Sequence, residues 1–400
     1  MKILVLNCGS SSVKYKLIDT TTDATLAEGG IEKIGLEDGF LKFKTADGSK
    51  QVKEIGMMDH KKAVESILNI LTDETYGCIS SYSEIDAVGH RVVHGAEKFS
   101  ESVLITDEVI QQVKDCYDLA PLHNPANITG IEAITALIPE VPQVGVFDTA
   151  FHQTMPAKSY MYALPYKFYT ENAVRRYGFH GTSHRYVSAR AAEFLGININ
   201  DCKMVTCHIG NGGSITAVLN GKSVDTSMGL TPTEGLMMGT RVGDVDPGAI
   251  TYLMTKYGLS VSEIQNIINK DSGVAGISGL SNDMREIEAA VKEKHERATL
   301  ALDMYEQRII KYIGAYAAEM GGLDVIVFTG GVGENQTGVR ENVCAPLAFM
   351  GVKLDNELNA KIRGTETLIS TVDSKVKVVV IPTDEELMIA RDTEAILNKK

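Results

Sequence analysis

The sequence predicts an α/β protein made of two related domains, and three observations support this fold class. The chain opens with an apolar run at residues 3–6, the polar turn NCGSSSVKYK at 7–16 and an alternating strand. A second strand, turn and strand, KMVTCHIGNGGSITAVLNG, occupies 203–221. Elsewhere, short apolar runs alternate with helical patterns, and 400 residues with 44% hydrophobic composition suffice for two or three domains.

The first half of the chain is expected to form strands and then helices. The expected elements are, in order, a strand from residue 13 with period-2 alternation, a hairpin around Asp47-Gly48, a helix near 60–71, a strand running into a loop in DAVGHRVVHG (86–95), a helix in HNPANITGIEAITAL (123–137) with Asn124 as its cap and Pro125 in its first position, and a buried strand in VPQVGVFDTAFH (141–152) that ends at Asp148. A carboxylate at the carboxyl end of a buried strand is where α/β folds place chemistry.

The second half is expected to continue this alternation after its own hairpin. The expected elements are a helix in DPGAITYLM (246–254) capped by Asp246, a long or broken helix over 284–320, a strand, glycine turn and amphipathic helix in DVIVFTGGVGENQTGVREN (324–342), and a buried strand followed by a helix in VKVVVIPTDEELMIARDTEAIL. Thr383 and Glu386 have the spacing of a capping box for that last helix.

Composition limits the kinds of partner. Lys and Arg number 39 against 52 Asp and Glu, which gives a formal charge of −13 and disfavours nucleic acid or an anionic membrane as the main partner. No long uncharged apolar run and no basic-then-apolar leader is present, so we expect a cytoplasmic protein. The six cysteines form no CxxC pair, which predicts reduced and mostly buried thiols.

The polar turns that follow apolar strands indicate phosphate binding. In NCGSSSVKYK, one glycine and three serines place backbone N–H groups and hydroxyls side by side, although a plain hairpin is an equally good interpretation of these residues alone. The missing second glycine excludes a Walker-type loop. Three such turns, spread over both halves, predict a nucleotide-using enzyme whose domains grip phosphates in a closing cleft.

Ten segments in order resemble the acetokinase family, which includes acetate and propionate kinases. They are NCGSSSVKYKLID, GHRVVHG, PLHNP, VFDTAFH, YGFHGTSH, HIGNGGS, TPTEGLMMGTRVGDVDPG, SNDMR, FTGGVGEN and IPTDEE. The similarity covers essentially the whole chain. It implies the actin-like (ribonuclease H-like) fold of the superfamily that also contains sugar kinases and heat-shock chaperones. The implied domains are 1–149 plus 383–400, and 150–382, the latter binding nucleotide and forming a homodimer.

The resemblance also implies a reaction, in which ATP phosphorylates acetate to give acetyl phosphate and ADP, reversibly and by direct in-line transfer. Mg²⁺ is the implied cofactor, which Mn²⁺ can replace, and ATP or ADP is a substrate. Propionate kinase is the nearest alternative and butyrate kinase a more distant one. A nucleotide-dependent chaperone or sensor of the same superfamily is a further alternative, but it gives Arg91 and Arg241 no purpose.

The resemblance assigns roles to residues throughout the chain. The implied catalytic residues are Asp148, Arg91, Arg241 and His180, of which His180 and Arg241 stabilise the transition state. Magnesium is implied to lie near Asn7 and Glu385. The residues implied to bind nucleotide or phosphate are Asn7, Ser10, Ser12, Lys14, His208, Ile209, Gly210, Asn211, Gly212, Gly213, Asp283, Met284, Arg285, Gly331, Val332, Gly333, Glu334 and Asn335. His123 is expected to lie near His180.

Each of these assignments has a structural alternative. In sequence, Arg91 and Arg241 lie among glycines and valines, but Asp244 and Asp246 follow Arg241 and offer a salt bridge. Asp148 has the alternative of capping a turn. His180 and His184 have the spacing of metal ligands, yet the sequence offers no further zinc-ligand set, and Ser183 between them has the character of a helix cap.

A small apolar pocket would separate acetate from propionate. By the resemblance, Val93, Leu122, Phe179 and Pro232 surround the methyl group, while ordinary core packing is their alternative. Valine at position 93, opposite a phenylalanine, favours a pocket that holds one methyl group.

Overall fold

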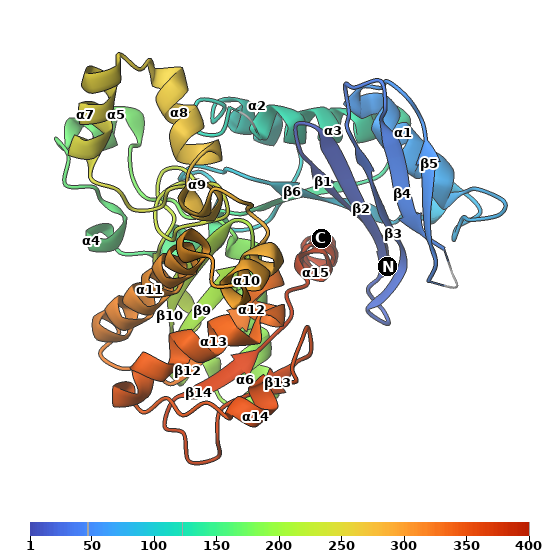
Figure 1. The fold of residues 1–400 in the computed structure, drawn as a ribbon. Coiled ribbons are helices and arrows are strands. Elements are labelled where there is room, and N and C mark those ends of the chain that lie inside the picture. The colour runs from blue at the N-terminus through green and yellow to red at the C-terminus, as the bar shows by residue number, and fades with distance from the viewer. Residues whose placement is uncertain (46–47, 122, 400) are drawn as a thin grey trace. The chain divides into compact units, whose positions relative to one another are not determined.

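The computed structural model describes residues 1–45, 48–121 and 123–399, which form two compact units. Unit 1 consists of Met1–Ala150 and of the segment from Asp384 onward, and unit 2 consists of Phe151–Thr383. Each unit has one mixed sheet (Figure 1). Unit 2 is therefore continuous in sequence, whereas unit 1 is made from both ends of the described chain.

The sheet of unit 1 has the strand order β5-β4-β3-β2-β1-β6-β8-β7. Its strands are β1 (Lys2–Cys8), β2 (Ser12–Asp19), β3 (Ala24–Glu32), β4 (Phe40–Lys44), β5 (Lys50–Glu54), β6 (Ala87–Val92), β7 (Val103–Leu104) and β8 (Gln143–Phe147). The pairs from β5 to β1 are antiparallel, while β1, β6 and β8 run parallel. The β4–β5 hairpin confirms the prediction around Asp47-Gly48, although Asp47 itself lies outside the described residues.

The sheet of unit 2 has the order β11-β10-β9-β12-β14-β13. Its strands are β9 (Lys203–Ile209), β10 (Gly213–Leu219), β11 (Lys222–Thr226), β12 (Val325–Thr329), β13 (Thr367–Leu368) and β14 (Lys377–Val380). An antiparallel β11-β10-β9 meander leads into the parallel strands β9, β12 and β14. The same arrangement, β3-β2-β1 followed by parallel β6 and β8, forms the centre of unit 1. This shared order confirms the prediction of two related α/β domains.

Helices cover both faces of the unit 1 sheet. They are α1 (His60–Leu71), α2 (Asp107–Lys114), α3 (Asn124–Leu137) and α15 (Glu385–Asn398). Because side chains alternate along a strand, Leu4 and Leu6 of β1 pack with α1 and α3, while Ile3 and Val5 pack with α15. The side chains of α15 lie so close to β6 that a Cβ at Gly89 would be 2.6 Å from those of Ile389 and Thr393.

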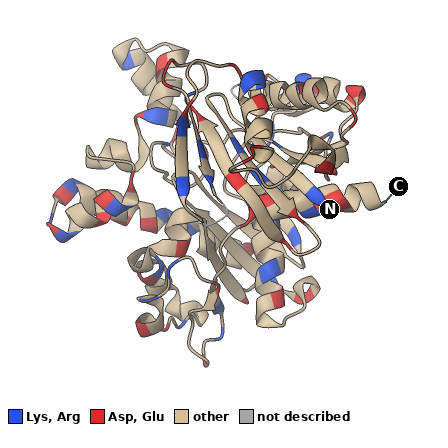
Figure 2. Ribbon diagram, turned by 90° about the vertical axis from the view of Figure 1, so that its right-hand side faces the viewer, with Lys and Arg blue, Asp and Glu red and all other residues tan. Residues whose placement is uncertain are grey.

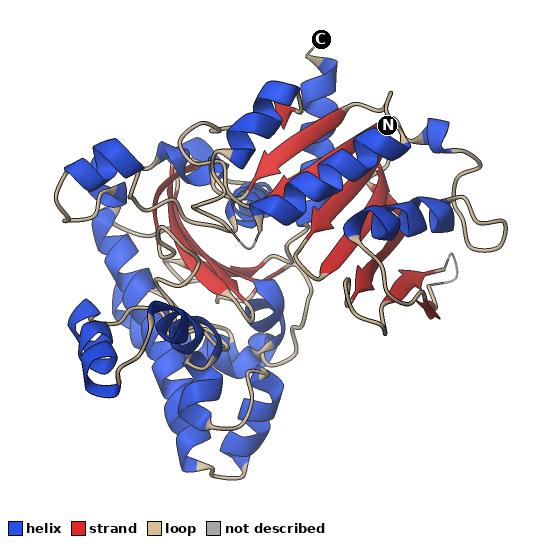
Figure 3. Cartoon of the chain, turned by 90° about the horizontal axis from the view of Figure 1, so that it is seen from above, coloured by secondary structure: helices blue, strands red, loops and turns tan. Residues whose placement is uncertain are grey.

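Unit 2 has the same layered plan with more helices, which Figure 3 shows in blue around the red strands. They are α4 (Ala157–Tyr160), α5 (Lys167–Asn172), α6 (Gly181–Leu195), α7 (Pro247–Tyr257), α8 (Val261–Lys270), α9 (Gly273–Ser278), α10 (Met284–Lys292), α11 (Glu296–Glu319), α12 (Gly330–Asn335), α13 (Thr337–Cys344) and α14 (Asn356–Asn359). The long helix α11 packs on one face of the sheet with α10 and α13, and α6 packs on the other.

Most predicted elements are confirmed, but several local predictions are wrong. Helix α3 begins at Asn124 rather than being capped by it, because the Asn124 amide is hydrogen-bonded to the backbone N and O of His94, at 3.1 and 2.9 Å. The segment GGVGEN forms the short helix α12 directly after β12 instead of a glycine turn. The last helix, α15, is capped by Asp384, not by a Thr383–Glu386 capping box. The break predicted within 284–320 falls between α10 and α11.

The surface carries charges of both signs, and the cysteines are free thiols. Figure 2 shows Lys and Arg residues interspersed with Asp and Glu along the outer helices, so any anion site has to be built locally. All six cysteines are free, and all but Cys78 are buried, as predicted. Among the described residues, no helix has the length and hydropathy needed to cross a membrane.

Candidate active site

Arg91 and Asp148 form the central ion pair of unit 1. Arg91 is near the end of β6 and Asp148 directly follows β8, and these two strands are parallel neighbours. The guanidinium Nη2 of Arg91 donates to Oδ2 of Asp148 at 2.6 Å, and its Nε lies 3.0 Å from Oδ1. Asp148 is only 2% exposed, and its negative charge is the largest cause of the raised pKa of Arg91. Arg91 therefore has an acidic partner that its sequence neighbours do not reveal, and Asp148 holds an arginine rather than capping a turn.

Glu385 faces this pair from the start of α15. A small cavity is lined by Val5, Asn7, Lys14, Tyr15, Arg91, Glu385, Glu386 and Ile389. Burial raises the pKa of Glu385 to about 7; Arg91 opposes this increase, and the charges of Asp148 and Glu386 add to it. The cavity thus brings together three of the predicted site residues from β1, β2 and β6 with the predicted metal-binding acid.

The neighbours of Glu385 have other partners. Asp384 accepts a hydrogen bond from the backbone N–H of Leu387 at 3.0 Å and from Lys16 at 3.2 Å. Glu386 also accepts from Lys16, at 3.5 Å. Glu385 makes no side-chain hydrogen bond within the described residues. Of the three acids in TDEE, Glu385 is therefore the one without a side-chain hydrogen-bond partner in the described part of the chain.

The serine turn of the first hairpin lies beside the same ion pair. Gly9 N–H donates to Ser12 O at 2.8 Å and closes the turn, and Asn7 is paired with Lys14 across it. The buried Asn127 side chain donates to Cys8 O at 2.7 Å and accepts from Val93 N–H at 3.0 Å, which ties this turn to the loop after β6. Ser10 is exposed and Ser12 partly exposed, so both are accessible to a ligand. Val93 is 8% exposed, and Leu122 lies outside the described residues.

His180 is the centre of the predicted residues in unit 2. It precedes α6 and has a left-handed backbone, with φ 54° and ψ 23°. This conformation costs a non-glycine residue about 1–3 kcal/mol and is typical of functional sites. Its ring stacks on His208, with centroids 4.3 Å apart. Ser183 is not the helix cap; its hydroxyl contacts Nδ1 of His208 at 2.7 Å and the hydroxyl of Thr383 at 2.8 Å.

The zinc alternative for His180 and His184 gains no support from the geometry. Nδ1 of His180 and Nε2 of His184 both contact the Ser214 hydroxyl, at 2.9 and 2.7 Å, and Nδ1 of His184 contacts Thr206 at 2.7 Å. Within residues 1–45, 48–121 and 123–399, no group of three or more His, Cys, Asp or Glu is arranged to hold a metal ion. Nδ1 of His180 and both ring nitrogens of His184 are thus hydrogen-bonded to hydroxyl groups.

Arg241 has no carboxylate partner among the described residues. Its Nη1 donates to Pro232 O at 3.2 Å and lies 3.7 Å from the Met238 sulfur, and burial lowers its pKa. Asp244 instead accepts from Gly235 N–H and Tyr312, and Asp246 caps α7. The salt-bridge alternative for Arg241 is therefore wrong, and its positive charge is not neutralised by a neighbouring acid.

The HIGNGGS turn lies next to Arg241 and His180. A Cβ built on Gly212 would be 3.3 Å from Nη1 of Arg241 and 4.0 Å from Nε2 of His180. The turn is closed by Gly210 N–H donating to Gly212 O at 2.9 Å, and Asn211 O accepts from Gly239 N–H at 2.9 Å. The remaining predicted residues of this segment are strand residues at its edges, namely His208, Ile209 and Gly213. A bulkier residue at position 212 would occupy the space between both side chains.

The segment GGVGEN is held from behind by Arg340. This fully buried arginine donates to the carbonyl oxygens of Gly333 and Glu334, both at 2.9 Å, and of Ile362 at 2.8 Å. Asn335 donates to Gly331 O at 2.9 Å. A Cβ on Gly331 would meet no other atom within 4 Å, which leaves open space beside that backbone. Val332 is buried.

The segment SNDMR contributes the start of α10. Asp283 caps the helix by accepting from Arg285 N–H at 2.9 Å, and it forms an ion pair with the exposed guanidinium of Arg285. This contact lowers the pKa of Asp283 to about 2. Met284 is buried in the core. Asn282 donates to Asn211 at 3.1 Å, so this segment adjoins the HIGNGGS turn.

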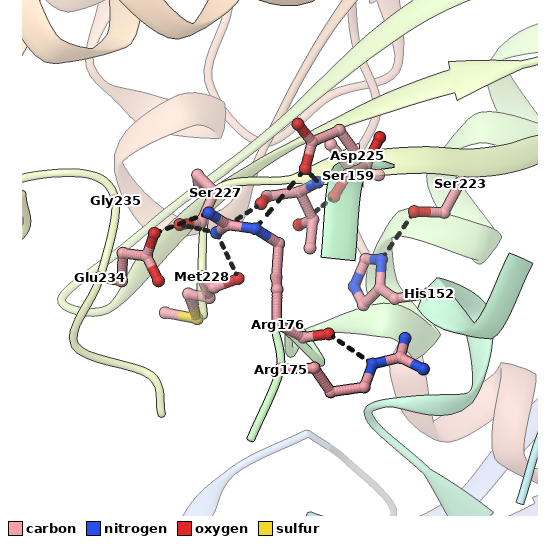
Figure 4. Close-up of polar contacts among 12 residues, drawn as sticks. His152, Ser159, Arg175, Arg176, Ser223, Asp225, Ser227, Met228, Glu234 and Gly235 are labelled. Atoms are coloured by element: carbon pink, nitrogen blue, oxygen red, sulfur yellow. Dashed lines mark hydrogen bonds and ion pairs between the residues drawn. The ribbon is translucent and has the colours of Figure 1, made fainter. Parts of the chain in front are cut away.

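A buried polar network anchors the segment that leads to His180 (Figure 4). The guanidinium of Arg176 donates to the carbonyl oxygens of Thr226, Ser227 and Met228 at 3.0–3.1 Å and to Glu234 at 2.6 Å. His152 contacts Ser223 at 2.8 Å and Phe179 O at 2.9 Å. Neither Arg176 nor Arg340 is distinguished by a motif in the sequence, since most of their partners are backbone carbonyls that only the fold brings near.

Comparisons with known proteins agree with one another. The model of the acetokinase family matches residues 2–391. A relative described as acetate kinase from Bacteroides thetaiotaomicron is 63% identical over 399 residues, with all of both chains covered. The crystal structure of Porphyromonas gingivalis acetate kinase matches with a TM-score of 0.96 at 61% identity, covering 99% of each chain. A propionate kinase structure from Francisella tularensis has a TM-score of 0.92 at 44% identity, again over 99% of each chain.

Proposed function

Because the chain belongs to the acetokinase family, we propose that it transfers the γ-phosphoryl group of ATP to acetate, reversibly, giving acetyl phosphate and ADP. The observation that carries this proposal is the 63% identity to an acetate kinase over the full length of both chains. The actin-like fold of the two units agrees with it, as does the acetate kinase structure at a TM-score of 0.96.

Phosphoryl transfer needs positioned groups and positive charge more than covalent chemistry. We assign Arg91 and Arg241 to the carboxylate of the acid and to the equatorial oxygens of the transferring group. Acetate is already ionised at neutral pH, so its oxygen attacks in line without a general base. Asp148 orients Arg91 through the bidentate contact. The absence of a carboxylate partner for Arg241 among the described residues supports a role toward a substrate anion.

His180 is assigned a hydrogen bond from its ring to the transferring phosphoryl group. Its left-handed backbone, its anchored segment and its position beside Gly212 and Arg241 support this role. The residues assigned to the phosphates and adenosine of ATP are His208–Gly213, Asp283–Arg285 and Gly331–Asn335. The open space beside Gly331 supports the last of these.

Asn7 and Glu385 fit a Mg²⁺ ion, which Mn²⁺ can replace. Both line one cavity, with Asp148 as a nearby negative charge, and Mg²⁺ prefers one or two carboxylates together with substrate phosphates and water. When bound, the ion neutralises charge on the phosphate oxygens. Ser10, Ser12 and Lys14 are assigned to the phosphate end of the same turn.

The acid we propose is acetate, with propionate as a poorer substrate. Val93 and Phe179 are buried, and with Leu122 and Pro232 they are the residues assigned to the methyl group. An apolar pocket distinguishes one methylene by about 1–3 kcal/mol. The propionate kinase of Francisella tularensis, at 44% identity, is less similar to this chain than the acetate kinase of Bacteroides thetaiotaomicron, at 63%, which favours acetate.

We also propose a cytoplasmic homodimer that associates through unit 2. Large exposed hydrophobic side chains lie on and near α5, α7 and α8, including Tyr166, Tyr252, Tyr257 and Val261, each at least 60% exposed. Such a group is typical of an interaction surface. Sedimentation at micromolar concentration tests this, because a species of only 43.3 kDa would contradict the dimer.

Trapping of acyl phosphate with hydroxylamine tests the proposed reaction. Purified protein is incubated with ATP, Mg²⁺ and acetate, propionate or butyrate, and the hydroxamate is measured. We expect the highest kcat/KM with acetate. Higher kcat/KM with propionate would favour propionate kinase, and ATP hydrolysis without any hydroxamate would favour a chaperone or sensor.

A further inference from the structure

Four buried or partly buried polar side chains form a continuous chain of hydrogen bonds that ends at His180. The Thr206 hydroxyl on β9 lies 2.7 Å from Nδ1 of His184, whose Nε2 lies 2.7 Å from the Ser214 hydroxyl on β10. Ser214 in turn lies 2.9 Å from Nδ1 of His180. Thr206, His184 and Ser214 have no exposed surface. The chain therefore links the interior of unit 2 to one defined atom of the His180 ring.

His184 is neutral within this chain. Burial lowers its pKa well below the usual value, and the neighbouring His152 and His208 lower it further. A neutral imidazole has one ring nitrogen that donates and one that accepts. The role of one His184 ring nitrogen therefore fixes the role of the other. If Nε2 carries the proton and donates, Nδ1 accepts; if Nδ1 carries the proton and donates, Nε2 accepts.

The Thr206 hydroxyl selects one of the two directions. If it donates to His184 Nδ1, then Nε2–H donates to Ser214, and the Ser214 hydroxyl is left to donate to His180 Nδ1. In the opposite direction His184 would donate to Thr206, whose own proton would need another acceptor. Within the described residues, the Thr206 hydroxyl makes no hydrogen bond besides that to His184. Because a buried donor without an acceptor costs about 1–3 kcal/mol, the first direction is favoured.

In the favoured direction, Nδ1 of His180 is an acceptor and its proton is on Nε2. That nitrogen is the one nearest to Gly212, where a Cβ would be 4.0 Å from it and 3.3 Å from Nη1 of Arg241. The N–H of His180 and the guanidinium of Arg241 thus adjoin the same glycine. A donor at Nε2 is what a hydrogen bond to a phosphoryl oxygen requires.

We propose that Ser214, supported by His184 and Thr206, is a positioning residue that holds His180 in the Nε2–H tautomer and presents this proton to the transferring phosphoryl group. The proposal rests on the role given to His180 in the proposed function. The sequence offers no sign of it, because Thr206 and Ser214 lie in two strands and His184 in a helix.

Nitrogen-15 NMR of the histidine rings tests the tautomer directly in the full-length protein. Long-range proton–nitrogen correlations distinguish protonated from unprotonated ring nitrogens, and the His180 signals are those missing from a His180→Asn variant. We expect Nε2 to be protonated and Nδ1 unprotonated at neutral pH. A proton on Nδ1 in the unmodified protein would overturn the proposal without any need for a variant.

Variants test the role of the chain in transfer. In Ser214→Ala, we expect His180 to populate both tautomers. We expect kcat with acetate to fall about 10- to 100-fold, the usual loss when the hydrogen-bond partner of a metal-ligating histidine is removed. The KM for ATP should change little. Thr206→Val, which keeps the side-chain shape, should act in the same direction. The matched control is Ser188→Ala, which changes a buried serine on α6 whose hydroxyl donates to Arg185 O and has no second hydrogen bond among the described residues. It should leave the His180 signals and kcat unchanged.

The outcomes separate this proposal from the proposed function. An unchanged tautomer population in Ser214→Ala, or a changed population with unchanged kcat, would refute the positioning role. The expected tautomer in an unmodified protein that forms no acyl phosphate would support the tautomer assignment and refute the proposed function.

Discussion

His90 is predicted to make the stability of unit 1 depend on pH. It lies on β6, is 2% exposed, and its Nε2 is 2.8 Å from Oε1 of Gln143. Because Nε2 of Gln143 donates to Thr135 at 2.8 Å, its Oε1 is the atom that faces His90 and accepts from the ring. Burial lowers the pKa of His90 from 6.5 to about 4, although the hydrogen bond to Gln143 opposes this decrease.

The sign and size of the effect follow from these values. Between pH 6.5 and 4 the unfolded chain binds a proton at His90 that the folded chain does not, so unfolding becomes more favourable as the pH falls. A pKa of about 4 in place of 6.5 corresponds to about 3 kcal/mol. About 2 kcal/mol of this contribution to the free energy of unfolding is lost when the pH is lowered to 5. It is fully present above pH 6.5.

The variant His90→Gln removes the titration and keeps a donor for Gln143. Urea unfolding, followed by far-UV circular dichroism at pH 5 and pH 8, gives the free energy of unfolding of both proteins. Other titrating groups, including the equally buried His152 of unit 2, cancel in the difference between parent and variant. We expect the parent to gain about 2 kcal/mol relative to the variant from pH 5 to pH 8. A difference that is the same at both pH values would refute the reasoning.

Three further predictions concern substrate and structure. Arg91→Ala and Arg241→Ala should each lower kcat by about three orders of magnitude with the fold retained; a near-normal kcat for either variant would remove that arginine from the mechanism. Val93→Ala should shift the ratio of kcat/KM toward propionate, by at most about 10- to 200-fold, with KM for ATP unchanged; an unmoved ratio would remove Val93 from the acyl pocket. Arg340→Met should lower the free energy of unfolding by several kcal/mol, because it leaves the carbonyl oxygens of Gly333, Glu334 and Ile362 unpaired, about 1–3 kcal/mol each. The exposed Arg285→Met is its matched control, and a similar loss in both would contradict this account.

Many of the strands were predictable along the chain because their signals are local. Apolar runs followed by glycine or serine turns mark β1, β9 and β12, and the repeat of a hairpin indicated two related units. The helix caps were less predictable. Asn124, Ser183 and Thr383 all have capping side chains, but each makes a tertiary hydrogen bond instead, to His94, His208 and Ser183 respectively. Tertiary contacts of this kind outweigh the local preference.

The candidate site was predictable in its residue types but not in its pairings. The chain order separates Arg91 from Asp148 by 57 residues, and only the parallel pairing of β6 and β8 brings them together. Likewise, Arg241 is followed by two aspartates, yet the turn directs them to Gly235 and to the start of α7. The resemblance of the segments therefore identified the charged groups, and the fold determines which of them neutralise one another.

The way in which α15 completes unit 1 has a consequence for synthesis on the ribosome. Unit 2 is one uninterrupted segment, so all of its strands exist before Glu385 is translated. In unit 1, the sheet face formed by Ile3, Val5 and Val146 is covered by Ile389 and Ala390 of α15. These two residues are translated more than two hundred residues later. During that interval an apolar sheet surface is uncovered while a second domain folds. Unit 1 is thus finished last although it is begun first, so we expect its nascent form to be more prone to aggregation than that of unit 2.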